Sequence, residues 1–595
     1  MGPDADRQRR GPRMMRSHYA GDLTAADIGA QVSLCGWVDS RRDHGGIVFL
    51  DLRDVRGLAQ VVLDPERLPS AHGVRSEWVL RIEGTVRARP EGTVNPDLDT
   101  GEIEVVGDVV EVLSEAEPLP IPIDDRTEVE EALRLKYRFL DLRRPRMQAN
   151  LRLRSRLALA IRRSMEEQGF VDVQTPTLTR STPEGARDFL VPSRKQPGTF
   201  YALPQSPQLF KQLLMVAGLD RYYQIATCWR DEDLRADRAY EFVQLDAEMS
   251  FATDEDVMRF IEEAVGAAIG EVSGERPGPF ARMTWAEAKA RFGSDKPDTR
   301  FGMELFEITE VFESTEFRAF AGKAVVGLGI TGASDTPRNR LDAWTERAKA
   351  LGGAGLVWMR VGPDALDSPV AKFLQPAELS AVRESLKVDD GDLVLVVADD
   401  DLRRAQTLLG ALRLEIGSEL GHRPASLADN LHLLWVTDFP LFEGVDADGA
   451  PQSGHHPFTA PHPEDVALLD DRPLDVRSMA YDLVVNGIEL GSGSVRIHQR
   501  ELQERIFGLL GIPPEVSAAR FGFLLEAFRY GVPPHAGFAF GIDRLAMVIA
   551  GEQSLRDVIA FPKTQSGSDP LTGAPAAVDD DQLRDLGLRA IPPKD

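Results

Sequence analysis

The sequence predicts an α+β protein of several domains, in which a small β-barrel precedes a larger region of hairpins and helices that an inserted α/β stretch interrupts. Three observations carry this prediction. The chain has 595 residues, far more than one hydrophobic core usually supports. Short β-branched segments separated by Gly and Asp crowd residues 32–113. Beyond residue 148, stretches with helical spacing of apolar residues alternate with extended ones.

Composition is that of an ordinary globular protein. No run of about 18 apolar residues could span a bilayer, so we expect a soluble, cytoplasmic protein without a membrane partner. The sequence has two cysteines, Cys35 and Cys228, without the spacing of a zinc site or a disulfide framework. The formal net charge of −26 excludes a globally basic surface but not a local basic stripe. Arginines concentrate in 7–16, 41–56 and 134–163, where we expect RNA contact.

The first domain contains five segments typical of strands: VSLCGWV, GIVFLDLRD, LAQVVL, WVLRIEGTVRAR and GEIEVVGDVVEVL. Five or six strands in so short a stretch predict a barrel of the oligonucleotide-binding (OB) type. Alternation in Val48–Arg53 points Phe49 and Arg53 away from the barrel interior. An exposed ring beside a cation suits an unstacked RNA base, although a covering loop is an equally good interpretation of one such ring.

Changes of pattern divide the rest of the chain. The stretch EAEPLPIPIDD holds three prolines and reads as a linker, whereas helical spacing from Gln148 to Gln168 opens a second domain. We expect a basic disordered arm over 1–16, the barrel over 17–114, a linker or hinge over 115–147, core parts over 148–295 and 428–563, an inserted domain over 296–427 and a disordered tail over 564–595.

A strand, a charged loop and a second strand follow one another in YYQIATCWR, DEDLRADRAY and EFVQLDAEMS. Alternation places Gln244, Asp246 and Glu248 on one face of the second strand. Such a polar floor is costly to bury unless it binds a ligand, and the alternative is a solvated sheet face. At the start of the loop, Arg230 and Glu232 offer a cation for a phosphate beside a carboxylate.

A second predicted hairpin indicates a bound ligand more specifically than the first. Asn486-Gly487 predicts a type I′ turn that pairs Val484 with Glu489, so that Asp482 and Glu489 share a face. Two carboxylates held this close favour a bound cation, and Mg²⁺ prefers one or two carboxylates together with phosphate oxygens.

The stretch GSGS that follows leaves bare backbone at Gly491 and Gly493, where a nucleotide could lie. Simple parity sends Arg496 to the opposite face from Glu489, so placing the two together requires a β-bulge in GSGS.

A third segment, GFAFGIDRLAMVIAG, predicts a strand, a glycine turn and a helix with Arg544 in its first turn. A lone arginine there is more often structural than catalytic. In this order, however, the segments resemble the three motifs of the class II aminoacyl-tRNA synthetases: Pro176 in VDVQTPTL for motif 1, Arg230-Asp231-Glu232 for motif 2 and Gly541-Ile542-Asp543-Arg544 for motif 3.

Longer strings narrow the resemblance to the aspartyl-tRNA synthetases of bacterial type: STPEGARDF, LPQSPQLFKQLLM, RDEDLRADR, HHPFT, GSGSVRIH, YGVPPHAGFAFGIDRL and RDVIAFPK. The resemblance covers nearly everything from about Ser17 to Lys563. It implies an OB-fold anticodon-binding barrel, an antiparallel catalytic sheet flanked by helices, a homodimer formed around motif 1 and an inserted domain of the GAD type.

The same resemblance implies the substrate contacts. Aspartate would be held by Glu184, Ser206, Gln208, Lys211, Arg230, Asp246, His455 and Arg496. ATP would contact Arg230, Asp231, Glu232, Glu489, Gly541, Ile542, Asp543 and Arg544, with Asp482 and Glu489 as ligands of Mg²⁺ and Arg230, Glu232 and Arg544 as catalytic residues. The charges fit, because two cations suit the β-carboxylate and two anions suit the ammonium group.

Two places in the sequence stand out against this resemblance. Where many relatives carry Gln-Pro, this chain has Ala239-Tyr240, so one family contact to ATP is missing. His455 and His456 resemble a mobile loop that closes over the substrate, and without a third ligand a metal site there is disfavoured.

The implied reaction is attack of the aspartate α-carboxylate on the α-phosphate of ATP, which gives aspartyl-adenylate and pyrophosphate. A terminal ribose hydroxyl of tRNA then attacks the adenylate. Because no covalent enzyme intermediate is needed, the protein's task is positioning and charge neutralisation.

The resemblance also bears on which tRNA is charged. Phe49 would stack on an anticodon base, with Arg42, Gln60 and Glu104 nearby. Strict relatives tend to carry Leu and a bulkier residue such as Lys where this chain has His44 and Gly92, which predicts charging of both tRNA(Asp) and tRNA(Asn). The alternatives are a strictly discriminating enzyme, an asparaginyl-tRNA synthetase and a non-catalytic RNA-binding paralogue.

Overall fold

The computed structural model describes residues 15–182, 186–363, 365–447 and 449–591. The chain forms two compact units, one up to Pro122 and one from Ile123. The expected disordered arm falls mostly on residues 1–14, outside the described residues. Among the helices of the described ranges, none is long and apolar enough to cross a membrane.

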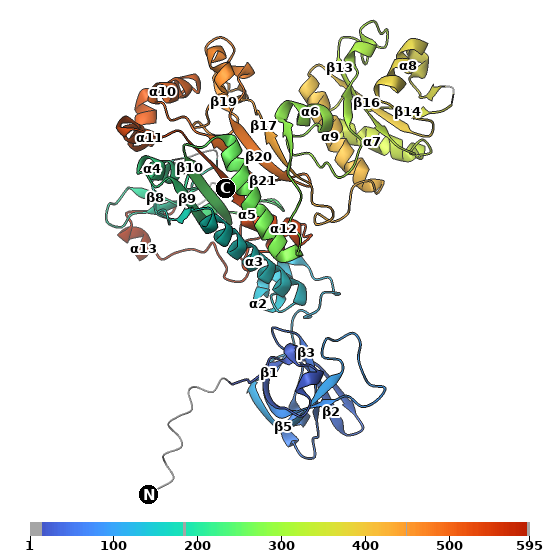
Figure 1. The fold of residues 1–595 in the computed structure, drawn as a ribbon, viewed down its shortest axis with the longest axis vertical. Helices are drawn as coiled ribbons and strands as arrows, with labels where there is room; N and C mark the ends of the chain where they lie inside the picture. Colours follow the sequence, from blue (N-terminus) through green and yellow to red (C-terminus); the bar gives the residue numbers. More distant parts are fainter. Residues whose placement is uncertain (1–14, 183–185, 364, 448, 592–595) are drawn as a thin grey trace. The chain divides into compact units, whose positions relative to one another are not determined.

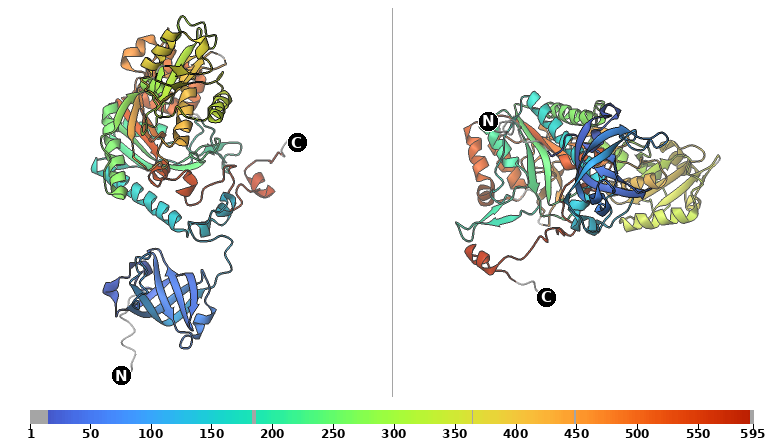
Figure 2. Two further views of the ribbon diagram at one scale, coloured as in Figure 1. Left: turned by 90° about the vertical axis from the view of Figure 1, so that its right-hand side faces the viewer. Right: turned by 90° about the horizontal axis from the view of Figure 1, so that it is seen from below.

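The first unit is a closed five-stranded barrel, as the spacing of β-branched segments predicted. The barrel is the blue part of the chain in Figure 2, and its strands pair in the order β1-β2-β3-β5-β4. Their bounds are β1 (Gln31–His44), β2 (Ile47–Arg53), β3 (Leu58–Leu63), β4 (Val79–Ala88) and β5 (Ile103–Ser114). Val48, Leu50 and Leu52 of β2 are buried in the barrel core, so Phe49 lies on the outer face as expected.

The second unit is built on an eight-stranded sheet of order β11-β17-β20-β21-β22-β10-β9-β6. The strands are β6 (Val171–Asp172), β9 (Arg221–Trp229), β10 (Glu241–Ser250), β11 (Ala281–Thr284), β17 (Leu433–Thr437), β20 (Ala480–Val485), β21 (Ile488–Val495) and β22 (His535–Gly541). All neighbours pair antiparallel except β11 with β17 and β6 with β9. The antiparallel prediction therefore holds for the sheet's centre but not for its two edge pairs.

Three helices cover one face of this sheet: α3 (Pro145–Glu167), α5 (Asp254–Ser273) and α12 (Ile542–Ile549) (Figure 1). Their apolar sides pack with the inner side chains of β9, β10 and β22 in one core that includes Leu245, Ala247 and Phe538. Because Leu245 and Ala247 face this core, Gln244, Asp246 and Glu248 must point to the opposite face. Helix α3 begins three residues before the predicted start at Gln148.

The remaining elements of the second unit are α1 (Glu131–Lys136), α2 (Arg138–Asp141), α4 (Gln208–Val216), α6 (Trp285–Phe292), α10 (Arg500–Leu509), α11 (Pro514–Ala527), and the small pairs β7 (Leu190–Pro192) with β8 (Phe200–Ala202) and β18 (Phe442–Val445) with β19 (Pro451–Ser453). The predicted disordered tail contains a short helix, α13 (Asp580–Asp585), and Gly567 lies against the Tyr240 ring. The prediction of disorder is therefore wrong for this part of the tail.

The inserted stretch has its own five-stranded sheet of order β12-β13-β16-β14-β15, in which every pairing is antiparallel. Its strands are β12 (Leu305–Glu307), β13 (Ala324–Ile330), β14 (Val357–Val361), β15 (Leu366–Asp367) and β16 (Leu393–Asp399). Helices α7 (Arg338–Ala350) and α9 (Leu402–Glu419) share one core with the sheet, and α8 (Pro376–Ser385) shares the other.

Candidate active site

The polar face of the eight-stranded sheet opens into a cavity of about 520 Å³. Strands β10, β21 and β22, helices α4 and α12, and the loop between β9 and β10 line this cavity. Twelve of the residues predicted from the sequence meet there: Ser206, Gln208, Lys211, Arg230, Glu232, Asp246, His455, Glu489, Arg496, Gly541, Asp543 and Arg544. Segments far apart in the chain thus contribute to one site.

Four other predicted residues do not line the cavity or lie outside the description. Glu184 lies outside the described residues. Ile542 packs in the core beneath the sheet, and Asp231 forms a bridge with Arg187 outside the cavity lining. Asp482 stands behind His455, whose Nε2 lies 3.3 Å from Asp482 Oδ1. The predicted contacts of Ile542 and Asp231 with ATP therefore have no side-chain support in this geometry.

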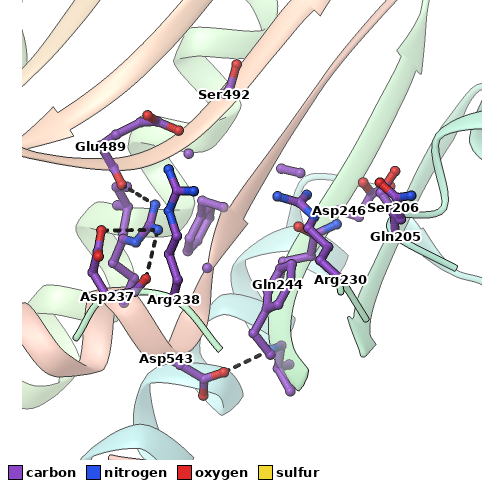
Figure 3. A pocket seen from close by; sticks show the side chains of 18 of the residues that line it. Gln205, Ser206, Arg230, Asp237, Arg238, Gln244, Asp246, Glu489, Ser492 and Asp543 are labelled. Atoms are coloured by element: carbon purple, nitrogen blue, oxygen red, sulfur yellow. Dashed lines mark hydrogen bonds and ion pairs between the residues drawn. The ribbon is translucent and has the colours of Figure 1, made fainter. Parts of the chain in front are cut away.

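Asp543 lines the cavity, but its carboxylate is occupied. Oδ1 accepts a hydrogen bond from Arg154 of α3 at 2.5 Å. Oδ2 accepts one from the backbone N–H of Val243 at 2.8 Å, the dashed line at Asp543 in Figure 3. The side chain ties α12 to α3 and β10, which positions the neighbouring Arg544.

One end of the cavity holds four buried charges in balance. Lys211 Nζ lies 3.0 Å from Asp246 Oδ2 and 3.2 Å from Glu248 Oε2. Arg496 donates to both oxygens of Glu248, at 2.9 Å from Nε and 3.2 Å from Nη2. Burial alone would raise the pKa of Glu248, but Arg496 and Lys211 lower it to about 2. Burial raises the pKa of Asp246, and Lys211 opposes this.

Glu248 is the main residue that the sequence placed correctly but to which it assigned no role. Alternation put it on the polar floor beside Asp246. Its partners are Lys211 of α4 and Arg496, the residue directly after β21, at sequence separations that no local pattern reveals.

The histidine pair has two separate roles in this geometry. Burial and Arg496 hold the pKa of His456 well below its ordinary value, so the ring is neutral and its Nε2 accepts a hydrogen bond from Arg496 Nη1 at 2.7 Å. Burial would lower the pKa of His455, but Asp482 raises it above its ordinary value. His456 thereby helps to orient Arg496, a role that the sequence did not indicate.

Four buried polar atoms of the cavity lining lack a hydrogen-bond partner within the described ranges: Gln208 Nε2, Gln244 Nε2, Asp246 Oδ1 and His455 Nδ1. Buried polar groups are almost always paired in native proteins, so such a cluster marks the seat of a polar ligand. Gln244 is a further lining residue to which the sequence assigned no ligand.

The hairpin β20–β21 shapes the other end of the cavity. Val484 pairs with Glu489 around the Asn486-Gly487 turn, as predicted. Leu483 pairs with Gly491, so the register shifts at Leu490. The expected bulge therefore exists but lies one residue before GSGS, because Leu490 is drawn into the core.

Glu489 and Asp482 are close enough to interact electrostatically. Burial and then the charge of Asp482 raise the pKa of Glu489. No group of three His, Cys, Asp or Glu side chains is arranged to hold a metal in the described part of the chain. Two carboxylates nevertheless suit Mg²⁺ when a nucleotide supplies the other oxygens.

Arg544 bridges the hairpin and the loop between β9 and β10. Its Nη1 donates to the Glu489 backbone carbonyl at 2.7 Å, and its Nη2 donates to the Asp237 carbonyl at 3.1 Å (Figure 3). Arg230 stacks over the Phe242 ring at 4.9 Å. Figure 3 shows Asp246 and Ser206 at one end of the cavity and Glu489 with Asp237 and Arg238 at the other.

Ala239 also lines the cavity, so the ATP contact that the resemblance implies to be missing falls at a position within reach of a ligand. The adjacent Tyr240 packs edge-on against Phe189, with ring centroids 5.4 Å apart.

On the barrel, three predicted anticodon residues form one hydrogen-bonded row. Arg42 Nη2 donates to Gln60 Oε1 at 3.4 Å, and Gln60 Nε2 donates to Glu104 Oε2 at 2.8 Å. Phe49 lies directly across from Arg42 in the pairing of β1 with β2. His44 is exposed at the end of β1, and Gly92 has a φ of +78° in the loop between β4 and β5.

Two families match the sequence. The family described as tRNA synthetases class II (D, K and N) matches residues 130–565, and the OB-fold nucleic acid binding domain matches residues 32–113. The aspartate–tRNA(Asp/Asn) ligase of Moorella thermoacetica is 53% identical over 585 residues and covers 97% of both chains. The ligase of the same name from Thermobifida fusca is 51% identical over 581 residues, which is 97% of this chain and 99% of its own.

Solved structures agree in fold. The asparaginyl-tRNA synthetase from Pyrococcus horikoshii with asparaginyl-adenylate has a TM-score of 0.57 at 18% identity and covers 93% of this chain and 99% of its own. The aspartyl tRNA synthetase from Entamoeba histolytica has a TM-score of 0.56 at 20% identity, covering 91% and 90%. At such low identity these likenesses concern the fold alone.

Proposed function

The chain belongs to the class II tRNA synthetases of the D, K and N group, and from this premise we infer that it charges tRNA with L-aspartate at the expense of ATP. It is an enzyme of the aspartate–tRNA(Asp/Asn) ligase type, as its full-length relatives at about half identity are. In this proposal one end of the cavity holds aspartate and the other end holds ATP.

The observation that carries the aspartate assignment is the buried set of Lys211, Asp246, Glu248 and Arg496. An ammonium carries three N–H groups, and two of those of Lys211 are directed to Asp246 and Glu248. Of the five N–H groups of Arg496, four are directed to Glu248, His456 and Ser494. One N–H on each cation therefore remains, among the described contacts, for the two oxygens of a β-carboxylate.

The free Asp246 Oδ1 suits the ammonium group of the amino acid. Asparagine presents a neutral amide to the same pair of cations, which leaves one of them facing an N–H donor. We therefore propose that the site rejects asparagine by leaving a buried cation without an anion.

The opposite end holds ATP in this proposal. Arg230, stacked on Phe242, and Arg544, fixed by two backbone carbonyls, neutralise charge on the phosphates while the aspartate α-carboxylate attacks the α-phosphate. Asp482 and Glu489 would hold Mg²⁺, which when bound supplies further neutralisation of phosphate charge. Gly491 and Gly493 of β21 line the cavity, but a Cβ at Gly493 would point into the core and collide with Tyr481 and Phe538, so close packing on the core side accounts for the glycine there.

We expect Glu489→Gln to raise the Mg²⁺ concentration for half-maximal pyrophosphate exchange by about tenfold, because it deletes one of two anions on the hairpin. Asp482→Asn should act in the same direction, and Mg²⁺ titrations of the exchange rate measure both. Glu501→Gln, an exposed position on α10, serves as the control. Unchanged titrations for both variants would remove the metal assignment.

The remaining parts of the proposal concern partners. The row of Arg42, Gln60 and Glu104 with Phe49 would read the anticodon of tRNA(Asp) and of tRNA(Asn). Exposed apolar side chains gather near motif 1, at Leu178, Leu190, Phe200 and Tyr201, and support a homodimer there. We also propose a cytoplasmic enzyme with the domain boundaries given above.

The direct test is ATP–pyrophosphate exchange with aspartate or asparagine, followed by aminoacylation of tRNA(Asp) transcripts. We expect exchange with aspartate at least about a hundredfold more efficient than with asparagine. Exchange that prefers asparagine would point to an asparaginyl enzyme, and no exchange with either amino acid would point to a non-catalytic paralogue.

A further inference from the structure

The inserted domain meets the catalytic sheet through two chain crossings, residues 296–303 and 423–432, which we call the insertion root. Both crossings contact the turn of the β20–β21 hairpin. Asn486 donates from Nδ2 to the Leu427 carbonyl at 2.7 Å and accepts from the His432 N–H at 2.9 Å. A Cβ placed on Gly487 would lie 3.1 Å from the Cβ of Asp298. The hairpin that carries Glu489 is therefore held from both sides.

The insertion root is itself rigid. Asp298 is fully buried and accepts hydrogen bonds from Arg300 at 2.8 and 2.9 Å and from Arg423 at 2.8 Å. Arg413 of α9 is also buried and donates to backbone carbonyls of the first crossing, those of Asp298, Phe301, Gly302 and Met303. One guanidinium with several carbonyl partners fixes this loop against the inserted domain.

Lys296 lies at the start of this rigid segment and points into the cavity. It lines the cavity together with Gly487 and Glu489, and its Nζ stands 3.9 Å from Glu489 Oε2. That separation allows electrostatic attraction but is too long for a hydrogen bond. The side chain is 50% exposed, so the ammonium is accessible to a ligand from the cavity.

The other cations near the hairpin are already engaged. Arg544 donates to the carbonyls of Glu489 and Asp237, and Arg238 Nη1 lies 3.5 Å from Glu232 Oε2. The same end carries the carboxylates of Glu489 and Asp482, which repel a triphosphate. Among the described contacts the Lys296 ammonium has no hydrogen bond, and its backbone follows directly into the fixed segment, so the ammonium is suited to phosphate oxygens beside these anions.

We propose that Lys296, which the insertion root places beside the cavity, binds the phosphate groups of the nucleotide. This inference rests on the proposed function, in which the hairpin end of the cavity holds ATP. It gives the inserted domain a direct part in substrate binding, because the segment that fixes Lys296 is anchored by Arg413 of that domain.

The test compares Lys296→Met with Lys296→Arg in pyrophosphate exchange. We expect the KM for ATP to rise at least about tenfold in Lys296→Met while the KM for aspartate stays within about twofold, and Lys296→Arg to recover most of the loss. Adenosine, which lacks phosphates, should inhibit wild type and Lys296→Met equally. Lys289→Met is the matched control, because Lys289 pairs with Asp295 at 3.6 Å and does not line the cavity.

An unchanged KM for ATP in Lys296→Met overturns the proposal. Weaker inhibition by adenosine in proportion to the KM for ATP also overturns it, since the change would then concern the shape of the nucleotide site. A lowered Tm in both Lys296 variants with no recovery in Lys296→Arg would identify a structural role and overturn it likewise. If wild type shows no aspartate-dependent exchange, the proposed function fails, and calorimetric binding of ATP to wild type and Lys296→Met still decides the role of Lys296.

Discussion

The Arg496→Leu variant is expected to lose aspartate-dependent pyrophosphate exchange by about a thousandfold or more, equivalent to about 4 kcal/mol of transition-state binding. Arg496 is 2% exposed and contributes one of the two cations available to the β-carboxylate. Its removal leaves Glu248 without its bidentate partner, so Glu248 would then repel the substrate and bind Lys211 alone. Steady-state exchange kinetics at saturating ATP measure the effect.

The same substitution also threatens the fold, because removing one partner of a buried ion pair typically costs about 3–5 kcal/mol. Arg496→Lys keeps the charge but lacks the planar fork that meets both oxygens of Glu248. We expect it to fold and to lose about a hundredfold in kcat/KM for aspartate with little change in the KM for ATP. Arg500→Leu, an exposed pair partner of Glu504 on α10, controls for the chemistry of the change. Aspartate activation by Arg496→Lys within a few-fold of wild type would contradict the assignment.

Local periodicity could predict the faces of the catalytic sheet. Period-2 alternation placed Gln244, Asp246 and Glu248 together, and the Asn486-Gly487 turn set the pairing of Val484 with Glu489. It could also predict that a bulge must precede Arg496, because parity demands one. It could not locate the bulge, since Leu490 is drawn into a core assembled from distant helices.

Local periodicity could not predict contacts between distant segments. The role of Glu248 depends on Lys211 of α4 and Arg496, which follows β21, both reaching β10, and that of Lys296 depends on the insertion root packing on a hairpin some two hundred residues later in the sequence. Helix and strand patterns specify the elements but not which loops meet. The motif resemblance supplied part of this missing information, because it implied roles for Lys211, Asp246 and Arg496, but it assigned none to Glu248 or Lys296.

The purified enzyme is expected to charge tRNA(Asn) within about tenfold of the efficiency for tRNA(Asp), whereas a strict enzyme would separate them by about a thousandfold or roughly 4 kcal/mol. The two anticodons differ only at the third base. His44, exposed at the end of β1, can donate or accept a hydrogen bond, and a side chain built at Gly92 would meet no atom within 4 Å. Neither residue therefore presents a steric or electrostatic barrier to the wrong base, and specificity against a partner needs such a barrier. Aminoacylation of separate transcripts measures the ratio.

His44→Leu combined with Gly92→Lys should restore discrimination, lowering charging of tRNA(Asn) about tenfold to a hundredfold relative to tRNA(Asp). The backbone at Gly92 has a φ of +78°, so any side chain there is strained by about 1 kcal/mol regardless of its chemistry. His44→Leu combined with Gly92→Ala carries the same strain without the lysine stem and isolates the effect of the longer side chain. If both double variants keep the wild-type ratio, these two positions do not determine which tRNA is charged. If wild type itself charges tRNA(Asn) a thousandfold less efficiently, the relaxed specificity is refuted, and the open loop around Gly92 is no part of recognition.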